Sequence, residues 1–258
     1  ISDKANNRKY PIADYSLTPT VAIVDPALVL TVPGFVAADT GMDVLTHATE
    51  AYVSQMASDY TDGLALQAIK LVFENLESSV KNADFHSREK MHNASTIAGM
   101  AFANAFLGIS HSMAHKIGAQ FHTVHGRTNA ILLPYVIRYN GTRPAKTATW
   151  PKYNYYRADE KYQDIARMLG LPASTPEEGV ASYAKAVYEL GERVGIEMNF
   201  KAQGVDEKEW KEHSRELAFL AYEDQCSPAN PRLPMVDHMQ EIIEDAYYGY
   251  KERPGRLK

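Results

Sequence analysis

Two pairs of metal-binding side chains, each spaced by four residues inside a run without Pro, constrain the fold of this chain most strongly. Asp43 and His47 form the first pair, and His111 and His115 form the second. Residues four apart lie on one face of an α-helix, so each pair can close on a single cation. With His125 nearby, the spacing predicts helices that meet at a divalent metal. It leaves open which of the histidines bind that metal.

Helical periodicity dominates the chain after Pro33 and Gly34. We expect a break near Gly118, before His125. Two β-like runs come first, at residues 9–12 and 20–24, and residues 140–156 resemble an extended surface loop. The fold class is therefore expected to be mainly α with a small β remnant at its start. The expected helices cover residues 36–54, 60–80, 87–107, 111–121, 128–139, 161–169, 176–194, 207–222 and 236–248.

Start and stop signals support two of the later helices. Thr175 precedes Pro176, and Asp206 stands three residues before Glu209, as helix N-caps do. Gly195 and Gly204 are expected turns.

Composition excludes several classes of partner. The formal charge of −5 provides no basic field, so neither nucleic acid nor a membrane surface is expected to bind. The single cysteine, Cys226, excludes an internal disulfide and a Cys-rich zinc site. No leader or spanning segment is visible, so we expect a cytoplasmic protein. The chain opens with Ile1 and resembles the interior of a longer protein, so we treat it as a fragment.

Burial strengthens the interpretation of the paired residues as metal ligands. Apolar or small neighbours flank both pairs, and buried ionisable groups need partners, which one shared cation would provide. Glu50 lies on the face of Asp43, and it either orients a histidine or packs against a basic residue. Four isolated histidines receive no role: His86, His92, His213 and His238.

Several spaced motifs together resemble the iron-dependent, group III alcohol dehydrogenases. The resemblance runs from Arg8 to Gly249 and is strongest to the alcohol dehydrogenase module of bifunctional aldehyde-alcohol dehydrogenases. That closer tie depends on residues 59–64, 151–162 and 223–226. The family motifs are Val24-Asp25-Pro26, residues 41–52, residues 99–102, the spaced His111, His115 and His125-Gly126, and Asn230-Pro231-Arg232.

The resemblance implies a role for each site residue. The implied metal ligands, for Fe(II) with Zn(II) as the alternative, are Asp43, His47, His111 and His125. His115 would lie beside the nicotinamide of NAD(H) and help to relay the proton. The implied cofactor neighbours are Lys9 and Leu28, and the implied walls of the substrate pocket are Phe102 and Cys226.

The resemblance also implies a domain plan and an activity. Residues 1–33 would end a dinucleotide-binding domain, and residues 34–258 would form the all-helical metal-binding catalytic domain. The expected reaction reduces acetaldehyde or a similar short aldehyde to a primary alcohol with NADH. An aldehyde dehydrogenase module would belong to the same polypeptide, which would assemble into homo-oligomers such as helical filaments.

Two other hypotheses belong to different classes. In one, the region mainly supplies filament contacts and its metal is structural, which a closed four-ligand site would favour. In the other, the chain is a metal- and NAD-dependent lyase or synthase on the related dehydroquinate-synthase-like fold.

Overall fold

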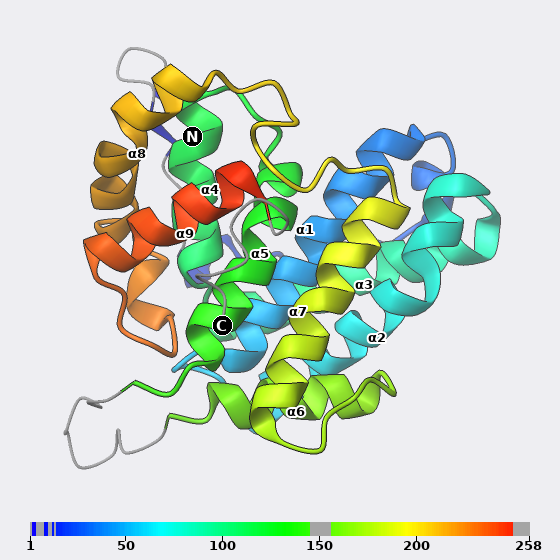
Figure 1. Ribbon diagram of the computed structural model, residues 1–258. Coiled ribbons are helices and arrows are strands. Elements are labelled where there is room, and N and C mark those ends of the chain that lie inside the picture. Colours follow the sequence, from blue (N-terminus) through cyan, green and yellow to red (C-terminus); the bar gives the residue numbers. More distant parts are fainter. Residues whose placement is uncertain (1, 4–7, 10–11, 13, 145–155, 250–258) are drawn as a thin grey trace.

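The computed structural model describes residues 2–3, 8–9, 12, 14–144 and 156–249, and these residues are mostly helical (Figure 1). A short antiparallel pair of strands stands at the start. The mainly α fold class is therefore confirmed. In chain order the elements are β1 (Ser2–Asp3), β2 (Arg8–Lys9), η1 (Tyr15–Leu17), η2 (Pro26–Val29), α1 (Gly34–Val53), α2 (Asp59–Lys81), α3 (Phe85–Ala105), α4 (Ile109–Gln120), α5 (His125–Gly141), α6 (Ala158–Met168), α7 (Pro176–Arg193), α8 (Glu207–Tyr222), η3 (Ser227–Ala229) and α9 (Val236–Tyr248).

Every expected helix is present, but the predicted break at Gly118 is wrong. Gly118 is buried inside α4, which continues to Gln120, and α5 already begins at His125. A glycine inside a helix costs only about 1 kcal/mol, which burial of the helix face outweighs. The chain turns instead at His122, whose φ of 55° lies in the left-handed region.

The predicted β-run at residues 20–24 is also wrong. These residues form no strand, and Val21 and Ile23 are 74% and 88% exposed. A strand needs a neighbour for its backbone hydrogen bonds, and the part of the chain that the structure describes pairs only β1 with β2. Of the other early run, Lys9 lies in β2, while residues 10–11 are outside the described residues.

The predicted loop at residues 140–156 falls mostly outside the described residues, which omit 145–155. Its first two residues, Asn140 and Gly141, still belong to α5. Residues 151–155 of the motif at 151–162, and the last nine residues, 250–258, likewise lie outside the described residues.

Two of the helices begin at the capping residues that the sequence predicts. Thr175 accepts a hydrogen bond from the backbone of Glu178, and Asp206 accepts from Lys208 and Glu209, which confirms both predicted N-caps. Gly195 and Gly204 adopt a φ of 84°, as expected of turn glycines.

Helix α5 lies in the middle of the helical fold (Figure 1), and it contributes side chains to two hydrophobic clusters. Its residues Ala130, Leu133 and Ile137 belong to the cluster that α1, α2, α3, α6 and α7 form. On its other face, Ile131 and Leu132 belong to the cluster with α4, α8 and α9. Since α1 and α4 both pack against α5, their polar faces are brought together at its N-terminal end.

No single described helix is long and apolar enough to cross a membrane. Helices α3 and α4 would pass that test only as a pair, and they meet at a bend of 107°.

Candidate metal centre

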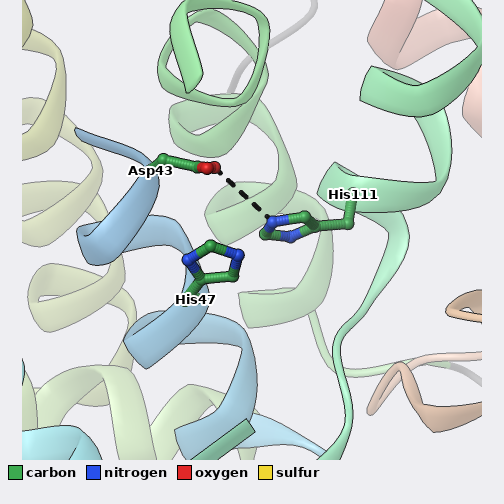
Figure 2. A group of neighbouring side chains, drawn as sticks. All are labelled: Asp43, His47 and His111. Carbon is green, nitrogen blue, oxygen red and sulfur yellow. Dashed lines mark ion pairs between the residues drawn. The ribbon is translucent and has the colours of Figure 1, made fainter. Parts of the chain in front are cut away.

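Three side chains from two helices converge on one point. Asp43 and His47 extend from successive turns of α1, and His111 extends from the first turn of α4 (Figure 2). One potential ligand atom from each lies within 4.8 Å of the others. The ring of His47 stacks on that of His111, with 4.5 Å between ring centroids. Helical spacing therefore supplies one pair of these groups, and helix packing adds the third.

Glu50 fixes the orientation of His111. Its Oε2 lies 2.6 Å from His111 Nδ1, and its Oε1 accepts a hydrogen bond of 2.7 Å from the backbone N–H of Ser110. His111 and Glu50 are only 1% and 2% exposed. The structure thus decides between the two predicted roles of Glu50, in favour of orienting a histidine.

The other ring nitrogen of His111, Nε2, is buried and has no hydrogen-bond partner. Its nearest anionic neighbour is Asp43 Oδ1, at 3.6 Å, which is beyond hydrogen-bond range. Native proteins rarely leave a buried polar nitrogen without a partner. A cation between His111, Asp43 and His47 would satisfy it, so these residues fit a divalent metal. Imidazole and carboxylate donors suit iron and zinc.

His125, the first residue of α5, lies at the edge of this cluster. Its Nε2 is 3.8 Å from Asp43 Oδ1, and its ring centroid is 5.4 Å from that of His111. Asn129 bridges the two, because its Nδ2 lies 2.8 Å from Asp43 Oδ1 and 3.3 Å from His125 Nε2. Sequence reasoning missed Asn129, although its position four residues after His125 could have indicated it.

Two glycines allow the helices to approach closely here. A Cβ at Gly126 would lie 2.8 Å from the carbonyl carbon of Asp39, closer still to its oxygen, and 3.1 Å from the Cβ of Asp43. A Cβ at Gly108 would lie 2.9 Å from Oε1 of Glu50. These distances are shorter than ordinary van der Waals contacts, so only glycine at these two positions lets α5 and α4 pack this closely against α1.

The electrostatics match a cation-binding site. Burial and the neighbouring His111 lower the pKa of His47 to about 3, so this imidazole is neutral, the form that binds metals. Burial lowers the pKa of His111, but Glu50 and Asp43 outweigh it and raise the value to about 9. For Asp43, burial alone would raise the pKa, yet the surrounding histidines hold it well below its usual range. Glu50 and Asp43 therefore favour positive charge at His111, and a bound metal would supply that charge in place of a proton.

A second cluster surrounds His115, one turn further along α4. His115 Nδ1 lies 3.2 Å from Asp224 Oδ2, and the Sγ of Cys226 is within 4.8 Å of both residues' ligand atoms. Lys116 Nζ is 2.8 Å from the same carboxylate oxygen and already supplies a positive charge. This cluster is therefore a poor metal site. Sequence reasoning gave Asp224 and Lys116 no individual role, since only the fold brings residue 224 to α4.

The remaining predicted site residues differ in how close they lie to the two histidine clusters. The ring of Phe102 stacks on His47 with 4.5 Å between centroids, and Cys226 is buried beside His115. Lys9 belongs to β2, which packs beside α4. Leu28 lies on η2, which contacts α3, and it is 74% exposed. The structure thus brings Phe102 and Cys226 to the two clusters, while the cofactor roles of Lys9 and Leu28 stay predictions.

Comparison with known proteins places this geometry in context. Residues 37–247 match the model of the Fe-containing alcohol dehydrogenase family, C-terminal. The chain is 97% identical over all 258 residues to the aldehyde-alcohol dehydrogenase of Streptococcus pneumoniae serotype 2, but covers only 29% of that protein. It is 44% identical over 256 residues to the bifunctional aldehyde-alcohol dehydrogenase AdhE of Escherichia coli K12, where 96% of this chain covers 28% of the relative. A 45% identity over 249 residues relates it to the NADPH-dependent butanol dehydrogenase of Clostridium saccharobutylicum, with 96% of this chain and 60% of the relative covered.

Solved structures give the same picture. An iron-containing alcohol dehydrogenase from Thermococcus thioreducens superposes with a TM-score of 0.81 at 35% identity, covering 92% of this chain and 57% of that one. A sulfoacetaldehyde reductase from Bifidobacterium kashiwanohense, solved in complex with NAD+, superposes with a TM-score of 0.78 at 28% identity, covering 95% of this chain and 59% of the other.

Proposed function

Because the chain belongs to the iron-containing alcohol dehydrogenase family, we propose that it reduces acetaldehyde or a similar short aldehyde to a primary alcohol with NADH. It would do so as the alcohol dehydrogenase part of a bifunctional aldehyde-alcohol dehydrogenase. The names and lengths of its relatives support this assignment, since the chain spans less than a third of the aldehyde-alcohol dehydrogenases that it matches.

One observation carries the proposal of a metal site. The buried Nε2 of His111 has no partner, and it faces Asp43 and His47 across a gap that a cation would fill. We assign the metal to Asp43, His47, His111 and His125, with Fe(II) as the expected ion and Zn(II) as the alternative. When bound, the metal would supply a Lewis acid for the carbonyl oxygen, and the nicotinamide would supply the hydride.

The residues of the chain itself would position the substrate and move the proton. Glu50 keeps the Nδ1 proton of His111 and leaves Nε2 free to bind. Phe102, stacked on His47, would form an apolar wall beside the aldehyde, with Cys226 as a second wall. His115 would exchange the proton of the alcohol oxygen. Lys9 and Leu28 would contact the cofactor.

The domain plan and partners follow from the same proposal. Residues 1–33 would end the dinucleotide-binding domain, and residues 34–258 would form the metal-binding domain. An aldehyde dehydrogenase module in the same cytoplasmic polypeptide would supply the aldehyde. The whole protein would form homo-oligomers, with helical filaments as one form.

Elemental analysis tests the metal site directly. The native polypeptide that contains this chain would be purified without oxygen, beside Asp43→Ala/His47→Ala and His111→Ala variants. We expect about one metal ion per chain in the wild type, and loss of both metal and aldehyde reduction in the variants. His86→Ala, at an exposed position, should change neither.

The outcomes separate the competing hypotheses. Metal present without reduction of short aldehydes would favour the structural-metal hypothesis or a lyase of the dehydroquinate-synthase-like type. Full turnover in a preparation that contains no metal would refute the ligand assignment.

A further inference from the structure

Asp224 is a buried carboxylate that lies next to the histidine we assign to proton exchange. It is 5% exposed and belongs to the turn before η3, more than a hundred residues from His115 on α4. We propose that Asp224 is a positioning residue that holds the Nδ1–H tautomer of His115. The inference builds on the proposed function, because it concerns how His115 exchanges a proton.

Three hydrogen-bond donors contact this carboxylate. Oδ1 accepts from the backbone N–H of Cys226 at 3.0 Å, and Oδ2 lies 2.8 Å from Lys116 Nζ and 3.2 Å from His115 Nδ1. Burial raises the pKa of Asp224, but the bonds with His115 and Lys116 outweigh it and lower the value to about 2. An ionised carboxylate only accepts, so Nδ1 of His115 must carry the hydrogen.

That hydrogen bond determines which nitrogen of His115 can react. Because the N–H at Nδ1 donates its hydrogen bond to Asp224, Nε2 is the nitrogen that can exchange a proton with the substrate. In aldehyde reduction Nε2 of His115 would give a proton to the carbonyl oxygen, and solvent would then return a proton to Nε2. In alcohol oxidation Nε2 of His115 would accept the hydroxyl proton. The hydrogen on Nδ1 stays on His115 throughout, hydrogen-bonded to Asp224, as in other carboxylate-oriented histidines.

Asparagine at position 224 would disrupt this arrangement without changing its size. A carboxamide has one oxygen, whereas the carboxylate uses both. If the amide oxygen still accepts the hydrogen bond from the Cys226 N–H, the NH₂ group faces His115 Nδ1 and donates a hydrogen bond to it. The ring hydrogen of His115 then moves to Nε2. If the amide is reversed, its NH₂ group opposes the N–H of Cys226.

Steady-state kinetics of the native polypeptide test the proposal in a double-mutant cycle. We expect Asp224→Asn to lower kcat about 100-fold, because a positioned acid–base group contributes roughly 10²–10⁴, with the KM for aldehyde and the metal content unchanged. In a His115→Gln background the same change should cost less than about threefold, since the two residues act as a unit. The matched control is Asp159→Asn, which removes another buried carboxylate, paired with Arg143, and should leave kcat unchanged.

A paired variant distinguishes this role from simple neutralisation of Lys116. Asp224→Asn/Lys116→Met removes the two opposite charges together and avoids an unpaired buried ammonium. If Asp224 acts through His115, the double variant keeps the roughly 100-fold loss. Recovery of kcat in it would overturn the proposal and assign the carboxylate to Lys116.

A chemical readout is independent of turnover. Diethyl pyrocarbonate attacks a proton-free imidazole nitrogen, and mass spectrometry of metal-free protein would follow its reaction at His115, with the exposed His86 as internal standard. We expect at least a fivefold slower reaction at His115 in the Asp224→Asn variant, because the ring hydrogen would then occupy Nε2 and the introduced amide would cover Nδ1. An unchanged rate, or kinetic losses that multiply in the cycle, would refute the role of Asp224. A protein that shows the chemical effect but reduces no aldehyde would refute the proposed function instead.

Discussion

Alanine at Gly126 should weaken both the fold and the metal site, although the same change elsewhere in a helix stabilises. The new Cβ would lie 2.8 Å from the carbonyl carbon of Asp39 and 3.1 Å from the Cβ of Asp43, where carbon atoms prefer about 3.5–4.0 Å. The start of α5 must therefore move away from α1 by roughly 1 Å. Such overpacking costs about 1–3 kcal/mol, and the better helix propensity of alanine returns at most about 1 kcal/mol, so we expect a net loss of up to about 2 kcal/mol.

Metal binding should be sensitive to this movement, because His125 directly precedes Gly126 in the chain. A binding group must hold its position to within about 0.5 Å. A shift of roughly 1 Å at His125 should therefore weaken metal binding at least about tenfold. Urea denaturation of the metal-free chain measures the loss of unfolding free energy. Competitive titration with Zn(II) against a chromophoric chelator measures the loss of metal affinity.

Gly63→Ala is the matched control. No atom lies within 4 Å of a Cβ at Gly63, which is an exposed position in α2. This substitution should raise the unfolding free energy by up to about 1 kcal/mol and leave metal affinity unchanged. If Gly126→Ala behaves like Gly63→Ala in both assays, then the close approach of α1 and α5 does not position His125, and the argument fails.

Three further predictions concern the buried polar groups. Glu50→Gln should weaken metal binding about 10- to 100-fold in the same titration, since one amide oxygen cannot accept from both Ser110 and His111, and an unchanged affinity would contradict the role of Glu50. Removing the metal by chelation should lower the unfolding free energy by about 2.7 kcal/mol relative to metal at 100 times its Kd, and calorimetry that finds the same Tm with and without metal would argue against the site. The pKa of Asp224 is lowered to about 2, below the unfolded value of about 3.9, so its contribution is present above about pH 4 and lost as the pH falls towards 2. The difference in unfolding free energy between wild type and Asp224→Asn should thus narrow on acidification, and a constant difference would count against the pairing.

Local sequence determined the helices and half of the metal cluster. Hydrophobic periodicity and capping residues such as Thr175 and Asp206 act over a few neighbouring residues. The helix positions could therefore be predicted directly from the sequence. The same local geometry places Asp43 and His47 on adjacent turns of α1. Strand pairing is not local, which is why the β-strand predicted at residues 20–24 is wrong.

Tertiary packing decided which groups meet across helices. Spacing made His111 and His115 equivalent, yet the fold places His111 against Asp43 and Glu50, and His115 against Asp224. The distinction arises because helical periodicity specifies only the face that a residue occupies. The neighbouring element depends on contacts between residues far apart in the chain, such as the close approach at Gly126 and the return of residue 224 to α4.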